Sequence, residues 1–219
     1  MRTLRAVGIV LLVTFSAAIT SWLIGAAVSR VSTNRQAPWI VGRAAGTTAY
    51  LLLVTLVALG LVLSHPWRTR IRRPSAAARI RLHISLSVFT LVFLVLHVVV
   101  LATDKYAGVG LSGALLPMGA TYRPVPVTLG MIGAYAGLLA GITAATAGHV
   151  GSRVWWPIHK VAAVSLVLVW VHGVLSGSDT PLLMGLYVVT GAATLVLALS
   201  RYVAKTPADR VAELVGDRR

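Results

Sequence analysis

Long runs of apolar residues, separated by short polar segments, dominate the chain. Roughly 20 helical residues cross the hydrocarbon core of a bilayer, and six runs reach that length: Val7–Ser29, Ala44–Ser64, Leu82–Thr103, Val127–Gly148, Ile158–Ser176 and Leu182–Ser200. The first run exceeds the roughly 7–15 apolar residues of a signal peptide, so we interpret it as a retained anchor. The pattern predicts an all-α membrane protein: a six-helix transmembrane bundle over residues 1–205, followed by a short cytoplasmic tail over 206–219.

The composition agrees with a membrane protein. Of 219 residues, 57% are hydrophobic and 11% are charged, whereas soluble domains carry about 25% charged residues. The absence of cysteine excludes disulfides, thiolate metal sites and covalently attached c-type haem. Of the 20 basic residues 17 are Arg, a bias typical of G- and C-rich bacterial genomes, so we expect a bacterial inner membrane.

The basic residues are divided unequally between the predicted loops. With the N-terminus inside, 15 of them lie on the cytoplasmic side, many in the loop PWRTRIRRPSAAARIR, and 5 lie outside. The positive-inside rule therefore predicts that both termini are cytoplasmic, and membrane topology explains the net charge of +15 without nucleic acid. The longest connection, Asp104–Pro126, is then on the outer side and is the expected docking or acceptor surface.

Histidine is the only ionisable residue type at depth in the predicted spans. A transporter coupled to protons or cations usually needs a carboxylate inside the membrane. All five acidic residues instead lie in predicted loops or in the tail: Asp104, Asp179, Asp209, Glu213 and Asp217. The histidines are therefore the candidate functional residues.

The third and fifth spans each carry two histidines. His83 and His97 are 14 residues apart and His159 and His172 are 13 apart, which is ~20 Å along a helix in both cases. Because both spans run from inside to outside, His83 is expected opposite His159 near the inner side, and His97 opposite His172 near the outer side. Two imidazoles on opposite sides suit an iron porphyrin, whereas zinc requires four ligands that converge.

The angular positions are less regular than the depths. On a straight helix His97 lies within ~40° of His83, but His172 lies ~140° away from the direction of His159. Tilt, supercoiling or a local bulge of the fifth span would have to correct that difference.

Other residues near the predicted inner side are candidates for the same site. Arg79, Arg81 and Lys160 flank the inner histidines and are candidate partners of porphyrin propionates. His65 and His149 fall at inner helix ends, where they reach headgroups or water, with a cofactor contact as the alternative. Four glycines of the fourth span predict close helix packing, with admission of a flat porphyrin as the alternative: Gly130, Gly133, Gly137 and Gly141.

These spacings make the chain similar to a known family. They resemble those of the ferric reductase-like transmembrane domain, a b-type cytochrome domain shared by NADPH oxidases, ferric reductases and MsrQ. Further similar segments fall within residues 40–200: GRAAGTTAYLLLVTLVALGLVLSHPWR, RPVPVTLG, WPIHKV and VHG. The resemblance implies two b-type haems stacked across the bilayer, the inner held by His83 and His159 and the outer by His97 and His172. It also implies that electrons pass outward.

The resemblance further implies an electron-transfer subunit. Oxidases and ferric reductases of the family carry a C-terminal flavin and NAD(P)H domain, whereas this sequence ends about 19 residues after the sixth span and has no Gly-rich dinucleotide motif. We expect a cytoplasmic flavoprotein or quinol as the donor, and an outer reductase, ferric iron or oxygen as the acceptor. MsrQ-type sequences lack that domain too, but they tend to have Gly where this chain has His83, which favours two haems. A single haem, a bound flavin, and a haem-free scaffold or transporter with structural histidines are the alternatives.

Overall fold

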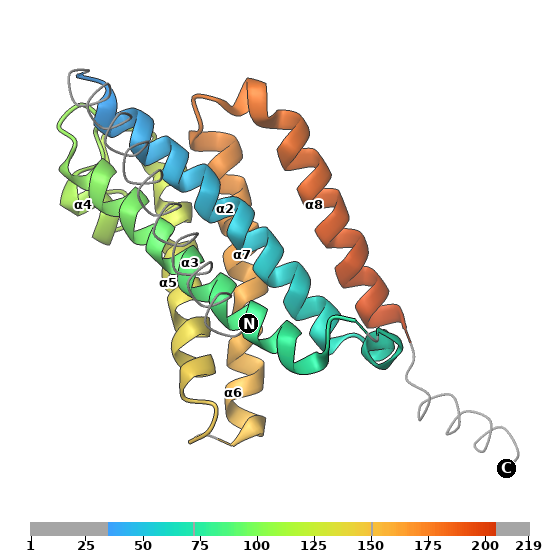
Figure 1. Ribbon diagram of the computed structural model, residues 1–219. Helices are drawn as coiled ribbons and strands as arrows, with labels where there is room; N and C mark the ends of the chain where they lie inside the picture. The colour runs from blue at the N-terminus through green and yellow to red at the C-terminus, as the bar shows by residue number, and fades with distance from the viewer. Residues whose placement is uncertain (1–34, 72, 150, 205–219) are drawn as a thin grey trace, which may run out of the picture.

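A computed structural model describes residues 35–204, apart from residues 72 and 150 (Figure 1). The predicted first span, Val7–Ser29, and the tail over 206–219 lie outside the described residues. In the described part all regular structure is helical, and five segments are long and apolar enough to cross a membrane. This confirms an all-α membrane protein, while the six spans and their orientation stay predictions.

The described elements follow one another in a simple order. They are α2 (Ala37–Ser64), the 3₁₀ helix η1 (Pro66–Arg70), α3 (Ala76–Thr103), α4 (Gly110–Leu115), α5 (Pro124–Ala145), α6 (Ser152–His159), α7 (Val161–Ser176) and α8 (Thr180–Val203).

Two helices begin well before the apolar runs that predicted them. α2 begins at Ala37 rather than Ala44, with a proline in its first turn, where a missing N–H costs nothing. α3 begins at Ala76 rather than Leu82, because the Ser75 hydroxyl accepts a hydrogen bond from the Ala78 N–H at 3.2 Å and caps the helix. Hydropathy locates the apolar centre of a span, whereas caps and prolines locate its ends.

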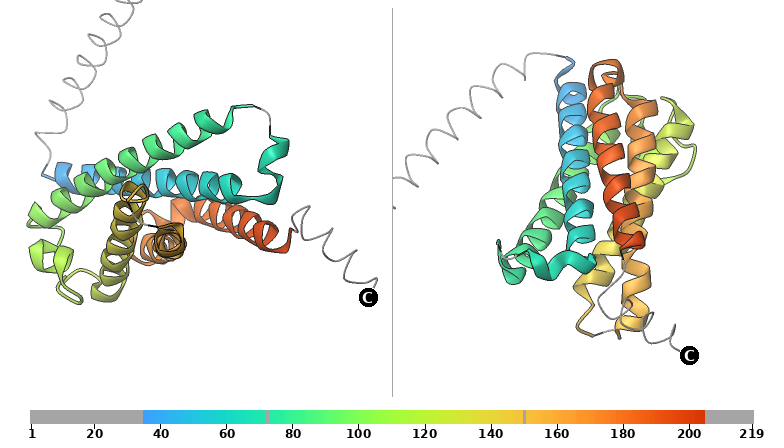
Figure 2. Two further views of the ribbon diagram at one scale, coloured as in Figure 1. Left: turned by 90° about the horizontal axis from the view of Figure 1, so that it is seen from below. Right: turned by 90° about the vertical axis from the view of Figure 1, so that its right-hand side faces the viewer.

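The long helices form two antiparallel pairs. α2 packs along α3, and α5 packs along α7, while α8 lies beside α2 and α7 (Figures 1 and 2). The main core cluster joins α2, α7 and α8 and consists of Tyr50, Leu53, Leu166 and Tyr187. By contrast, α3 touches α5 at only a few positions, so the two pairs meet chiefly through α2.

The bundle has two ends that differ in charge. We call them the η1 end, which holds η1, α6 and the end of α8, and the α4 end, which holds α4 and the starts of α2 and α8. Both described acidic residues, Asp104 and Asp179, are at the α4 end. The η1 end carries most of the described basic residues: Arg68, Arg73, Arg79, Arg81, Arg153, Lys160 and Arg201. It is the end predicted to face the cytoplasm.

The connection between α3 and α5 is a folded segment that contains α4. The N–H groups of Thr121 and Tyr122 both donate to the Gly108 carbonyl at 2.9 Å and close the segment on itself. Gly108 has φ +65°, a conformation that glycine adopts without strain. The surface expected to meet an acceptor is therefore ordered, and α4 within it had no apolar periodicity that would have predicted it.

Candidate functional site

The four predicted histidines meet in two pairs, one toward each end of the bundle. The ring centroids of His83 and His159 are 6.3 Å apart, and those of His97 and His172 are 6.4 Å apart. In each pair one imidazole comes from α3 and the other from α6 or α7. The structure thus brings together the residues that the sequence analysis paired by depth.

A break in the fifth span explains how His159 and His172 face the same helix. His159 is the last residue of α6 and α7 starts at Val161, so the predicted span Ile158–Ser176 is two helices. Pro157 lies inside α6, and the Lys160 N–H bonds to the Pro157 carbonyl at 3.2 Å, three residues back. A proline and a tightened turn change the direction and phase of a helix. The straight-helix projection that separated the two imidazoles therefore does not apply.

Backbone carbonyls orient the rings of the His97 pair. His97 Nδ1 lies 2.7 Å from the Gly42 carbonyl oxygen of α2, and His172 Nδ1 lies 2.8 Å from the Pro126 carbonyl oxygen of α5. A carbonyl only accepts, so each Nδ1 carries the proton and donates it. The neutral ring then has its lone pair on Nε2, which is the arrangement of a metal-binding histidine held by a second hydrogen bond.

The His83 pair is held less tightly. His159 Nδ1 lies 3.1 Å from the Ala140 carbonyl oxygen, while His83 Nδ1 is buried and faces the Leu56 backbone of α2 without a hydrogen bond of normal geometry. Arg79 Nε, one helical turn before His83 on α3, is buried with no hydrogen-bond partner among the described residues. A buried polar atom without a partner destabilises a fold by about 1–3 kcal/mol, so this level is the less complete of the two.

Three glycines give the imidazoles room against α2 and α5. A Cβ on Gly46 would lie 2.6 Å from His97 Nδ1, and one on Gly130 would lie 2.6 Å from His172 Nδ1. A Cβ on Gly60 would lie 3.3 Å from His83 Cε1. Gly46 lies four residues after Gly42, and Gly130 lies four residues after Pro126. Residues four apart lie on the same face of a helix, so each imidazole meets both the carbonyl and the glycine of one helix face.

The sequence analysis missed Gly46 and Gly60, although they carried a signal. They are 14 residues apart, the same spacing as His83 and His97. An equal spacing on two neighbouring helices indicates that each glycine lies at the depth of one histidine. Of the predicted glycine stripe, Gly130 lies against the His172 ring, and Gly133 packs against Val169 and Leu168 of α7. A Cβ on Gly141 would contact nothing within 4 Å, so the stripe is only partly a packing surface.

The pairs fit an iron porphyrin better than a bare metal ion. No three histidine or acidic side chains converge on one point in the described residues, so protein ligands alone leave an ion under-coordinated. Two imidazoles on opposite sides of one metal, with metal–nitrogen bonds of ~2 Å, place their ring centroids about 6 Å apart. The separations of 6.3 and 6.4 Å match that geometry, and a porphyrin supplies the other four nitrogens.

Four buried side chains lie between the two levels. Leu53 and Thr90 lie midway along α2 and α3, and Leu166 lies midway between His159 and His172; all three are buried. Ser165, beside Leu166, is 2% exposed and donates to the Gly133 carbonyl at 2.7 Å. The hydroxyls of Ser165 and Thr90 are thus satisfied by backbone carbonyls.

The candidate propionate contacts lie at the η1 end. Arg79 is 6% exposed and donates to the Ile71 and Arg68 carbonyls at 3.2 and 3.4 Å, which ties α3 to the preceding loop. Arg81 is exposed, and the exposed Lys160 has its Nζ 5.8 Å from the Trp156 ring centroid. Their contact with a cofactor stays a prediction.

The two remaining histidines occupy different surroundings. His65 is 3% exposed, its Nδ1 accepts from the Trp67 N–H at 3.2 Å, and its Nε2 lies 3.4 Å from Ser200 Oγ. It therefore caps η1 and connects it to α8, rather than reaching headgroups as expected. His149 is exposed in the turn after α5, as its predicted position at a helix end implied.

Comparison of the chain with protein-family models, with curated proteins and with solved structures gives no match in any of the three. The fold and the paired histidines therefore carry the functional argument alone.

Proposed function

We propose that the protein carries electrons across a membrane through two b-type haems, one held by His83 and His159 and the other by His97 and His172. The observation that carries this proposal is the pair of imidazole separations, 6.3 and 6.4 Å, at two levels of a membrane-spanning bundle. Helix packing alone does not require two histidines to face each other at this distance, let alone twice. When bound, a haem accepts and releases one electron at its iron.

The protein's own residues prepare the two sites. The Gly42 and Pro126 carbonyls hold His97 and His172 in the tautomer that binds iron. Gly46 and Gly130 let these rings approach α2 and α5. Leu53, Thr90 and Leu166 are buried between the levels and lower the polarity there, and low polarity around a haem helps to set its potential.

The direction of flow follows from the charge of the two ends. If the basic η1 end faces the cytoplasm of a bacterial cell, an electron that leaves that side gains ~2.3 kcal/mol per 100 mV of membrane potential. We therefore propose a cytoplasmic flavoprotein or quinol as the donor, and an acceptor or partner reductase at the α4 end. In this role the chain is the membrane subunit of an oxidoreductase, similar in principle to a ferric reductase-like domain.

Haem content of ligand variants tests this function. The detergent-purified protein should show a b-type spectrum with about two haems per chain by the pyridine haemochrome assay. His97→Ala and His172→Ala should each lose about half of that haem, whereas His149→Ala, which replaces an exposed histidine, should keep all of it. Full haem content in both ligand variants would refute the ligand assignment.

One observation favours a second candidate, a haem-free scaffold with structural histidines. The bonds from His97 to Gly42 and from His172 to Pro126 each join two helices, as structural polar contacts in membranes do. The same assay separates the two functions. A protein that purifies without a Soret band, even after expression with added haem, is the scaffold.

A further inference from the structure

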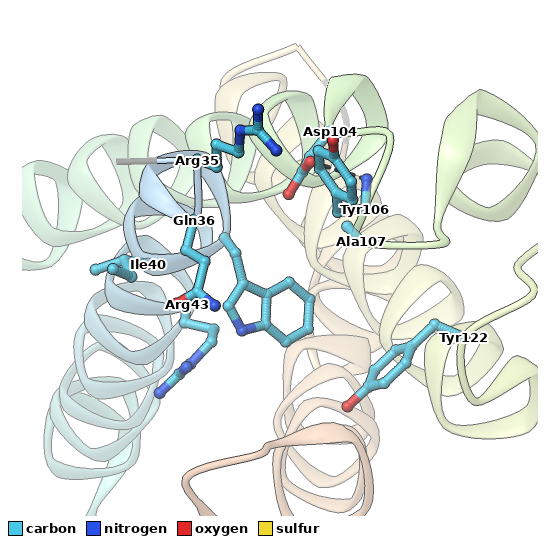
Figure 3. A pocket seen from close by; sticks show the side chains of 9 residues that line it. Arg35, Gln36, Ile40, Arg43, Asp104, Tyr106, Ala107 and Tyr122 are labelled. Carbon is cyan, nitrogen blue, oxygen red and sulfur yellow. Dashed lines mark hydrogen bonds between the residues drawn. The ribbon is translucent and has the colours of Figure 1, made fainter. Parts of the chain in front are cut away.

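A cavity opens at the α4 end, next to the His97 pair. Its volume is about 520 Å³, within the roughly 300–1,000 Å³ of small-molecule sites. The first turns of α2 form one wall, and the segment between α3 and α5 forms the other (Figure 3). The cavity lies at the edge of the apolar region, so it can be reached from the membrane surface.

Three aromatic side chains line the cavity, together with charged groups of both signs. Trp39 and Tyr122 meet edge to face with ring centroids 5.7 Å apart, and Tyr106, 81% exposed, stands at the rim. Two guanidinium groups, of Arg35 and Arg43, also line it. They are balanced by two carboxylates: Asp104, in the lining, and Asp179, which is ion-paired with Arg43. The aromatic walls favour a planar ligand that stacks on them. Within the lining Arg35 is balanced by Asp104, while Lys105 and Arg123 follow lining residues directly in the sequence.

Asp104 is an unusual member of this lining. It is 9% exposed, and its Oδ1 accepts a hydrogen bond from the Tyr106 N–H at 3.0 Å. Its other carboxylate oxygen has no partner within the described ranges and is not sealed from solvent. A buried carboxylate is stable only when its oxygens find donors, so this oxygen is placed to bind the O–H of a ligand that gains one on reduction.

Both walls of the cavity connect to the imidazoles of the His97 pair. On one side Trp39 lies three residues, less than one turn of α2, before Gly42, whose carbonyl binds His97 Nδ1. On the other side the Tyr122 hydroxyl donates to the Ser176 carbonyl at 2.9 Å, and Ser176 Oγ lies 3.1 Å from His172 Nδ1. One turn of helix is ~5 Å, so about one turn of α2 separates Trp39 from the carbonyl that binds His97.

We infer that this cavity is the electron-acceptor site and that it binds a quinone; this rests on the proposed function. A quinone is neutral and planar, so it stacks on aromatic rings, and its two carbonyl oxygens accept hydrogen bonds from groups such as the Arg35 guanidinium. A haem held by the His97 pair would supply the two electrons, one at a time, that reduce the quinone. Two protons from water on this side complete the quinol, with a new O–H bond at each oxygen, and Asp104 passes one of them.

The test uses menadione, a naphthoquinone without an isoprenoid tail, added from a solvent stock to the anaerobic haem-loaded protein in detergent. After stoichiometric reduction by dithionite, menadione should reoxidise the haem at a rate that saturates with its concentration. Tyr106→Ala and Asp104→Asn should slow that rate at least tenfold at sub-saturating menadione. Asn keeps an oxygen for the Tyr106 N–H, and Tyr106 is exposed, so neither variant should lose haem. Tyr202→Ala is the matched control, since Tyr202 is 72% exposed at the opposite end.

Binding is measured separately, by quenching of tryptophan fluorescence with menadione in the oxidised protein. The apparent Kd should rise about tenfold in Tyr106→Ala and stay unchanged in Tyr202→Ala. Haem-loaded protein whose reoxidation by menadione does not saturate, or is equal in all variants, overturns the inference and leaves the proposed function standing. Faster reoxidation by ferric citrate, lost in the same variants, assigns the cavity to a metal chelate instead. A preparation without haem overturns both proposals.

Discussion

Replacing Gly130 by alanine should disable the His97 pair without removing any ligand. The new Cβ would lie 2.6 Å from His172 Nδ1, whereas ordinary contacts begin near 3.4 Å. The imidazole must therefore move about 0.8 Å away from α5. This displacement disturbs both the 2.8 Å hydrogen bond to Pro126 and the 6.4 Å separation from His97, the two features that prepare the site for iron.

The expected result is loss of one of two haems, or a clear shift of its midpoint potential in a spectroscopic redox titration. Overpacking of this kind also destabilises a fold by ~1–3 kcal/mol. Gly185→Ala on α8 is the control, because its Cβ would also meet nothing within 4 Å and α8 carries no histidine. It should keep both haems and stabilise α8 by ~0.5–1 kcal/mol. If Gly130→Ala retains both haems with unchanged potentials, the missing side chain at Gly130 is not required for the position of the His172 imidazole.

Two further predictions concern the scaffold around the site. Tyr50→Phe removes the hydroxyl that bonds to Thr190 Oγ1 and joins α2 to α8. The melting temperature should fall by an amount equivalent to ~0.5–1.5 kcal/mol, and the haem content should stay unchanged. An unaltered melting curve would show that the bond contributes nothing to stability. Arg79→Leu removes the guanidinium that binds the Ile71 and Arg68 carbonyls, so limited proteolysis should cut the loop before α3 faster than in Arg81→Leu, whose side chain is exposed. Equal cleavage rates would contradict that role.

The sequence predicted the depths at which the four histidines lie, but not the helix break and the helix ends that orient them. The depth of each histidine follows from residue number alone, because a helix rises ~1.5 Å per residue, and the pairs His83 with His159 and His97 with His172 did meet. The direction in which His159 points could not be predicted from a regular helix. It depends on the break between α6 and α7, which involves Pro157 and the hydrogen bond from the Lys160 N–H to the Pro157 carbonyl. Helix ends were also missed, because caps such as Ser75 are not part of an apolar run.

The cavity at the α4 end could not be predicted from the sequence, for a different reason. Trp39 and Tyr122 are 83 positions apart along the chain and meet only because Gly108 closes the segment that contains α4. Their charged neighbours, Arg43 and Asp179, come from the starts of α2 and α8. Each residue has an ordinary place at a membrane interface, where aromatic and basic side chains are frequent, and only the fold makes them one site.

The unequal hydrogen bonding of the two levels predicts which haem is lost first. Both rings of the His97 pair have carbonyl partners at 2.7 and 2.8 Å. In the other pair, the distance for His159 is 3.1 Å, and His83 Nδ1 faces the Leu56 backbone without a hydrogen bond of normal geometry. The glycine found four residues after the bonded carbonyl in the His97 pair is replaced beside His159 by Ala144, so α5 cannot approach His159 as it does His172.

A metal ligand whose second hydrogen bond is weak is held less firmly, and loss of such a bond weakens metal binding about 10–100-fold. A preparation with one haem should therefore keep it at the His97 pair: His83→Ala would leave that haem in place and His97→Ala would remove it. The reverse pattern would show that the His83 pair, despite its weaker hydrogen bonds, is the stronger site.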